Sequence, residues 1–99
     1  MKTISRPVRR RPTEPRPATL TDAGLGAVIR AERRRQNLHQ DGLAAASGID
    51  PRVFSRIERG ERSCRVSELS AISTGLGVTS EELLARAQER HRAFGDAGT

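Results

Sequence analysis

Tryptophan and tyrosine are absent from this sequence of 99 residues, phenylalanine occurs twice and cysteine only once. Any hydrophobic core must therefore be built mainly from aliphatic side chains. A single cysteine excludes a disulfide within the chain and suits a reducing cytoplasm. No apolar run approaches the ~20 residues that a membrane-spanning helix needs, and the first residues do not resemble a signal peptide. These absences favour one small cytoplasmic domain.

Acidic residues are scarce relative to basic ones, and the excess positive charge is unevenly distributed. The 18 lysine and arginine residues, set against 12 acidic residues, give a net charge of +6. Residues 1–20 hold six basic residues and one acidic residue, and residues 30–65 hold nine arginines and five acidic residues. Residues 66–99 are acidic on balance. Such segregation is typical of a surface that faces a polyanion.

Periodic apolar residues are missing from residues 1–20, which contain four of the five prolines. Because this segment cannot bury enough apolar surface to offset its ordering entropy, we predict a disordered basic arm. The arm could enter a minor groove of DNA or follow its phosphates, and equally it could only keep the chain in solution. Binding to anionic lipid is a weaker alternative, because aromatic and amphipathic anchors are lacking. The arginines concerned are Arg6, Arg9, Arg10, Arg11 and Arg16.

Helical patterns begin at residue 21 and predict an all-α bundle of five helices. Capping signals mark three helix starts: Thr21 or Asp22, Asp50-Pro51, and Thr79 with Glu82. We expect helices at about residues 22–36, 40–47, 51–59, 66–76 and 80–92, hence a domain over residues 21–92 and a flexible tail over 93–99. The side chains expected to face the core include Leu25, Val28, Ile29, Leu43, Ala44, Phe54, Ile57, Val66, Leu69, Ile72, Leu76, Leu83, Leu84 and Ala87.

The predicted helix at residues 51–59 has two unlike faces. At 100° per residue, Arg52, Arg56 and Arg59 fall within an arc of about 60°. Phe54 and Ile57 fall on the other side of this helix. A solvated amphipathic helix would show the same pattern, so this helix alone leaves its function open.

The segment before this helix favours a nucleic-acid partner. Ala44 is small enough for two helices to cross closely, Gly48 permits a tight turn, and Ile49 can fill the angle between the helices. This helix-turn-helix arrangement would hold the second helix away from the body of the domain. A DNA major groove, about 12 Å wide, accepts one such helix.

Residues 25–84 resemble the Cro/C1-type helix-turn-helix family, also called XRE-like, of bacterial and phage regulators. The residues that carry the resemblance are Leu25-Gly26, Ile29-Arg30, Arg33, Asn37-Leu38, Gln40, Leu43-Ala44, Gly48-Ile49, Ser55-Arg56-Ile57-Glu58-Arg59-Gly60, Leu69, Leu76-Gly77-Val78 and Glu82-Leu83-Leu84. The resemblance implies a lambda-repressor-like domain that binds double-stranded DNA.

The resemblance also implies roles for single positions. Base edges would be read from Pro51, Arg52, Ser55 and Arg56. Because proline has no side-chain hydrogen bond to offer, we expect Arg52 and Arg56 to do the reading, each able to meet guanine O6 and N7. The predicted phosphate contacts are Gln40, Arg59, Arg62 and Arg65. Arg33 and Glu58 match an internal ion pair of the family, which would fix the orientation of two helices.

The sequence departs from the family pattern at four positions, one of which is Val53 in place of a usual small polar residue. His39 stands where serine or threonine usually caps the second helix, so we expect a weak cap there. Gly42 lies inside the same helix and lowers its stability by roughly 1 kcal/mol relative to alanine. Cys64 lies near the place of a usual proline and could be a redox switch or an incidental loop thiol.

We predict no enzyme, cofactor, metal site or small-molecule ligand. His39 and His91 lack companions at metal-ligand spacing, and no nucleophile–base pair or phosphate-binding glycine loop is evident. The pattern favours a nucleoid-associated transcriptional regulator, most simply a repressor, acting as a homodimer on a palindromic operator. Its dimer surface would lie on the fourth and fifth helices. The alternative is a protein-interaction module, antitoxin-like or an adaptor, that binds a protein partner through residues 81–99.

Overall fold

The computed structural model describes residues 20–98, which form five helices and no strand. The helices are α1 (Asp22–Arg35), α2 (Gln40–Ala46), α3 (Pro51–Glu58), α4 (Val66–Leu76) and α5 (Ser80–Gly98). The predicted all-α, five-helix class is confirmed, and the first four helices lie within one residue of the predicted bounds. Only α5 differs: it continues to Gly98 instead of fraying after Arg92. No proline interrupts it, and its one internal glycine lowers helix stability by only about 1 kcal/mol.

Side-chain caps fix where three of the helices begin. The Thr21 hydroxyl accepts a hydrogen bond from the backbone N–H of Gly24 at 2.9 Å, and Asp50 Oδ1 accepts one from Arg52 at 2.8 Å. Thr79 and Glu82 form the predicted capping box, with each side chain accepting from the other's backbone N–H at 3.0 Å. As expected, His39 gives α2 no side-chain cap. The short α2 is therefore held by packing against its neighbours.

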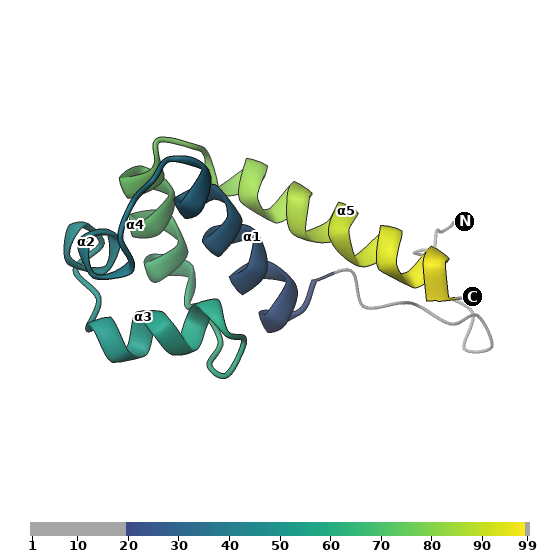
Figure 1. Ribbon diagram of the computed structural model, residues 1–99, viewed down its shortest axis with the longest axis horizontal. Coiled ribbons are helices and arrows are strands. Elements are labelled where there is room, and N and C mark those ends of the chain that lie inside the picture. Colours follow the sequence, from purple (N-terminus) through teal and green to yellow (C-terminus); the bar gives the residue numbers. More distant parts are fainter. Residues whose placement is uncertain (1–19, 99) are drawn as a thin grey trace, which may run out of the picture.

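Helix α1 lies at the centre of the fold, with α3 and α5 against it, while α2 packs on α3 and α4 (Figure 1). Phe54, Ile29, Ile57, Ile72 and Leu83 are the largest fully buried side chains. No helix among residues 20–98 is long and apolar enough to cross a membrane. Figure 1 shows that the C-terminal half of α5 continues well past the other four helices.

One predicted core residue is exposed. Val66 retains 86% of its surface in water, whereas Leu69, one turn later on the same helix, is buried. Val66 is the first residue of α4, so its side chain lies at the N-terminal end of the helix, before the part that the neighbouring helices cover. The prediction that Val66 is buried was wrong because periodicity reports the face of a residue but not where the covering neighbour ends.

Helices α1 and α3 approach each other very closely at Gly26. A Cβ atom at this position would lie 2.6 Å from the backbone oxygen of Glu58 and closer still to that of Ile57. Only glycine fits here, because backbone oxygens cannot swing aside as flexible side chains do. The close approach seats the C-terminal end of α3 on α1.

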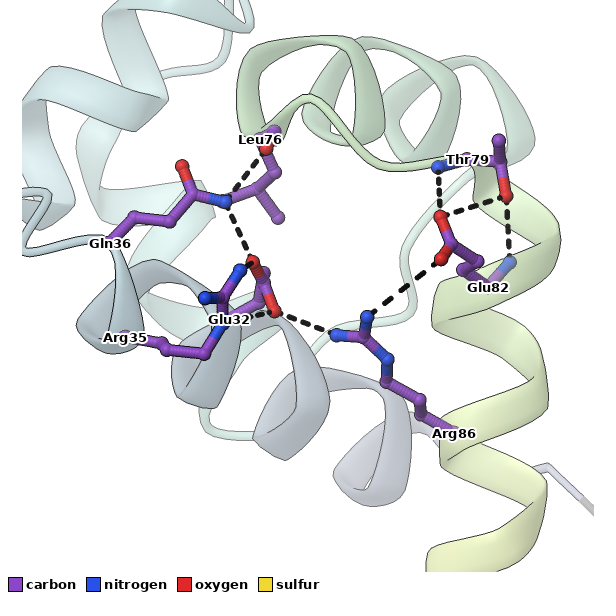
Figure 2. Close-up of polar contacts among 7 residues, drawn as sticks. All are labelled: Glu32, Arg35, Gln36, Leu76, Thr79, Glu82 and Arg86. Carbon is purple, nitrogen blue, oxygen red and sulfur yellow. Dashed lines mark hydrogen bonds and ion pairs between the residues drawn. The ribbon is translucent and has the colours of Figure 1, made fainter.

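A buried carboxylate on α1 ties α4 and α5 to that helix (Figure 2). Glu32 accepts hydrogen bonds from Arg35, from Gln36 Nε2 at 2.7 Å and from Arg86 Nη1 at 2.7 Å. Gln36 Nε2 also donates to the carbonyl of Leu76, the last residue of α4, at 2.7 Å. Hydrogen bonds from Arg35 and Gln36, and a weaker one from Arg86, outweigh the opposing effect of burial and lower the pKa of Glu32 from 4.5 to about 2.

Candidate nucleic-acid interface

Helix α3 presents two exposed arginines on a rigid support. Phe54 and Ile57 are fully buried beneath it, and Asp50 with Pro51 caps its start. Arg52 and Arg56 are exposed on the other side, and no hydrogen bond or ion pair within residues 20–98 engages either guanidinium group. Two free, permanently charged guanidinium groups one helical turn apart are suited to a partner rich in hydrogen-bond acceptors.

A shallow hollow runs along the exposed face of α3 and reaches α2. Its volume is about 340 Å³. The hollow is lined by all four residues predicted to read bases, namely Pro51, Arg52, Ser55 and Arg56. Asp41 and Arg59 line it as well. The structure thus brings these four side chains onto one surface, as the helical periodicity required.

The ion pair that the family resemblance implies is present and buried. Arg33 Nε donates to Glu58 Oε2 at 2.8 Å and Nη2 donates to Oε1 at 3.1 Å, while Nη1 donates to the carbonyl of Leu38 at 2.8 Å. Gln40 Nε2 donates to Glu58 Oε1 at 2.8 Å. Helices α1 and α2 therefore both donate to the Glu58 carboxylate of α3, and Arg33 also holds the loop after α1 through the Leu38 carbonyl. This network fixes the direction in which α3 presents its exposed face.

Comparison with known proteins agrees with this geometry. Residues 24–87 match the family model described as a helix-turn-helix domain. The chain belongs to the helix-turn-helix domain family of DNA-binding transcriptional regulators. The predicted resemblance to that family is confirmed.

Relatives of this helix-turn-helix chain include a curated regulator and two solved structures. The HTH-type transcriptional regulator y4mF of Sinorhizobium fredii is 33% identical over 70 residues, which span 71% of this chain and 91% of the relative. The clp gene regulator ClgR of Corynebacterium glutamicum is 25% identical with a TM-score of 0.76, covering 85% of this chain and 87% of ClgR. The restriction-modification controller protein C.AhdI of Aeromonas hydrophila is 29% identical with a TM-score of 0.61, and the match covers 63% of this chain and 94% of C.AhdI.

Two of the predicted phosphate-binding arginines of this helix-turn-helix domain hold intramolecular partners. Arg59 forms two hydrogen bonds of 3.0 Å to Glu61 and a third to the Ser55 hydroxyl. Arg62 forms two to Glu68, at 2.8 and 3.1 Å. The Arg59–Glu61 pair is exposed, so water screens it and a phosphate can replace Glu61 at small expense. The Arg62–Glu68 pair is more buried. Glu68 also accepts a hydrogen bond from the backbone N–H of Arg65 and so caps the start of α4.

The other predicted contacts occupy different settings. Gln40 uses one amide N–H on Glu58, which leaves its second N–H available to a phosphate. Arg65 is exposed at the start of α4. Arginines of the predicted arm lie outside the described residues: Arg6, Arg9, Arg10, Arg11 and Arg16. Their contact with DNA, like the other residue roles, stays a prediction.

Sequence reasoning did not assign a role to Arg30 and Arg34 on α1. Both are exposed and line a hollow of about 350 Å³ together with Gln40, Ser55 and Arg59. The signal was available, since two arginines four residues apart lie on one helical face. That this face borders α3 follows only from the fold.

Cys64, in the loop between α3 and α4, is a half-buried thiol. Burial, the larger cause, and the nearby Glu68 carboxylate raise its pKa to about 11. A thiol with a raised pKa carries little thiolate at neutral pH, so this setting favours the incidental thiol over the redox switch. Within the described residues, no group of three or more histidine, cysteine or acidic side chains is arranged to hold a metal ion.

Proposed function

We propose that this helix-turn-helix regulator is a sequence-specific repressor that binds a palindromic operator as a homodimer. Arg52 and Arg56 read base edges in the major groove, and Arg59 neutralises backbone phosphate. One observation carries the proposal: α3 keeps two arginines exposed and unbonded within the described part of the chain, on a helix whose direction is fixed by buried contacts. A helix held in this way can place a guanidinium fork against a base without a large ordering entropy.

Arginine on this face suits guanine in particular. The two parallel N–H donors of the fork match guanine O6 and N7, and such a bidentate contact discriminates against a wrong base by about 1–3 kcal/mol. Ser55 lies beside Arg52, one turn later on the helix, but its hydroxyl already accepts from Arg59. The arginines therefore supply most of the sequence preference.

A homodimer would provide the affinity that one small domain lacks. In helix-turn-helix dimers the two reading helices contact half-sites about 34 Å apart, one turn of DNA. The part of α5 that continues past the other helices, together with the exposed Val66 at the start of α4, supports a dimer surface on these two helices (Figure 1). Because the proposed partner is DNA, the place of action would be the nucleoid in the bacterial cytoplasm.

Selection of bound duplexes from a random DNA pool tests this function. We expect a palindromic consensus with guanine in each half-site, because two copies read it in opposite directions. Arg52→Ala or Arg56→Ala should lower affinity for the selected site by roughly ten- to hundredfold and remove the preference for it. Arg59→Ala should weaken the selected site and a scrambled duplex alike. Equal losses on both duplexes from all three variants would contradict the assigned reading roles.

Transcription in vitro then tests the direction of regulation. A promoter that carries the selected site should lose activity as protein is added, since a repressor excludes polymerase. Increased activity would reassign the protein as an activator.

The extension of α5 also supports a second candidate, a module that binds another protein through this helix (Figure 1). Under this alternative, the DNA selection would return no consensus. Truncation of the chain after Arg92 would leave its weak DNA binding unchanged but abolish capture of the partner. Under the repressor proposal, the same truncation should weaken binding to the full palindrome far more than binding to one half-site.

A further inference from the structure

The three consecutive arginines at the end of α1 occupy three different settings. Arg33 is buried on Glu58, and Arg35 pairs with Glu32 on another face of the helix. Arg34, between them, is exposed and has no hydrogen bond or ion pair to any residue in the range 20–98. The run is therefore not a uniform basic segment, because two of its charges are neutralised internally.

Arg30 lies one turn before Arg34 on the same face and is likewise exposed and unbonded within the described range. Like charges four residues apart repel each other and destabilise a helix by about 0.2–0.5 kcal/mol. No acidic side chain forms an ion pair with either guanidinium in the described structure. An external anion would offset this repulsion.

The surface in front of these two arginines continues into the reading face of α3. Arg30 and Arg34 share one hollow with Gln40, Ser55 and Arg59, and the last two residues also line the hollow over Arg52 and Arg56. A wider hollow of about 660 Å³ extends from the same arginines over Ala23, Ala27 and Ala31. The acidic residues that line the two hollows around Arg30 and Arg34, namely Glu58 and Glu61, are already paired with Arg33 and Arg59. Asp41 lines only the hollow over Arg52 and Arg56. Small alanines leave room for a backbone strand to approach α1 closely.

We infer that Arg30 and Arg34 form a second DNA-binding strip, which contacts the phosphates of the strand that borders the major groove occupied by α3. The inference rests on the proposed function and extends it to a surface of α1. Continuity with Ser55 and Arg59 favours DNA over an acidic protein, because a duplex seated on α3 brings its own backbone to this strip. The contact is to phosphate, so it adds affinity on every sequence and no preference among sequences.

The salt dependence of DNA binding tests the strip with the full chain. Arg30→Gln with Arg34→Gln removes two predicted phosphate contacts. We expect the slope of log K against log salt to become shallower by about 1.8, because each phosphate contact contributes about 0.9. The same relation predicts an affinity loss of about 30-fold at 0.15 M salt. Both changes should be equal on the selected operator and on a scrambled duplex.

Two controls separate phosphate contact from other effects. Arg30→Lys with Arg34→Lys keeps both charges and should keep the slope. Ser70→Glu with Thr74→Glu changes the net charge by the same amount, at the same spacing on an exposed face of α4. Measured on a single half-site, which one copy binds without the proposed dimer surface of α4 and α5, this variant should change the slope much less. The thermal midpoint of the Gln variant should not fall, because the variant removes only a repulsion between exposed groups.

Each outcome decides between the strip and the function as a whole. If the parent protein binds no DNA, the proposed function fails. If it binds with its salt slope unchanged in the Gln variant, the strip is wrong and the function stands. A loss of affinity confined to the operator would mean that α1 reads bases, and this result would overturn the inference. An equal change of the salt slope in the α4 control would show that net charge alone causes the effect, and this result would overturn it too.

Discussion

Two buried glutamates, Glu58 on α3 and Glu32 on α1, hold the two halves of this fold in different ways. Each accepts hydrogen bonds from arginine and from a glutamine. The Arg33 side chain on Glu58 is only 10% exposed, whereas Arg35 and Arg86 on Glu32 are 69% and 42% exposed. Glu58 therefore belongs to an ion pair in which both side chains are buried. Glu32 is also buried, but the arginines that donate to it are exposed to water.

The difference predicts unlike consequences when each carboxylate is removed. Without Glu58, Arg33 would remain in the interior with only the Leu38 carbonyl as an acceptor. Without Glu32, its arginines can turn into water, where their charge is satisfied. The orientation of the reading half, which comprises α2 and α3 on α1, is thus fixed more strictly than that of the α4–α5 half. Such a fixed orientation suits a helix that must meet DNA in one way.

Removal of Glu58 should have the largest effect. Glu58→Ala leaves a buried guanidinium without its counter-ion, and we expect a loss of about 3–5 kcal/mol in the free energy of unfolding. Urea denaturation followed by circular dichroism measures this loss. Binding to the selected operator should weaken even at temperatures where the variant stays folded, because α3 loses its tie to α1.

The paired variant Arg33→Met with Glu58→Leu is the matched control. It removes both charges and should recover most of the stability, since apolar side chains of similar size can replace a buried ion pair. If Glu58→Ala proved no less stable than this control, the burial of Arg33 would not be the reason for the loss.

The glycine contact on the same side of α1 should have the next largest effect. Gly26→Ala places a methyl group against the backbone oxygens of Ile57 and Glu58, and we expect a loss of about 1–3 kcal/mol through forced separation of α1 and α3. Gly42→Ala on α2 meets nothing within 4 Å. Thermal unfolding should show this second variant stabilised by up to about 1 kcal/mol, through helix propensity alone. Two equal shifts of the same sign would show that propensity, and not the close approach, governs both sites.

The sequence predicted most of the reading half because its signals are local. Caps at Thr21 and Asp50 fixed the starts of α1 and α3, and the spacing of Ala44, Gly48 and Ile49 indicated the turn. Such signals act within a few residues, so they remain legible without the fold. Resemblance to the family supplied the Arg33–Glu58 pair, which no local pattern reveals.

Contacts between distant segments were not predictable in the same way. Arg86 reaches Glu32 only because α5 lies on α1 in one register, 54 residues further along the chain. The partners of Arg59 and Arg62, namely Glu61 and Glu68, depend on the path of the loop after α3. An arginine in the sequence is always charged, but the sequence alone does not tell whether an internal acid neutralises it. The distinction between engaged and free arginines, on which the DNA contacts depend, came from the structure.

Replacement of Glu32 should have the smallest effect at neutral pH and the clearest dependence on acid. Glu32→Gln keeps the shape and loses the charge, and because its arginines can be hydrated we expect a loss of only about 1–3 kcal/mol at pH 7. The pKa of Glu32 falls from 4.5 to about 2 on folding, so its contribution is complete above pH 4.5 and disappears as the pH falls towards 2. The difference in unfolding free energy between parent and variant should therefore shrink over that window. Glu61→Gln, which removes an exposed carboxylate also paired with arginine, should leave stability nearly unchanged throughout. A difference between parent and Glu32→Gln that stayed constant from pH 7 to pH 2 would contradict the lowered pKa of Glu32, and with it the stabilisation of its charge by Arg35 and Arg86.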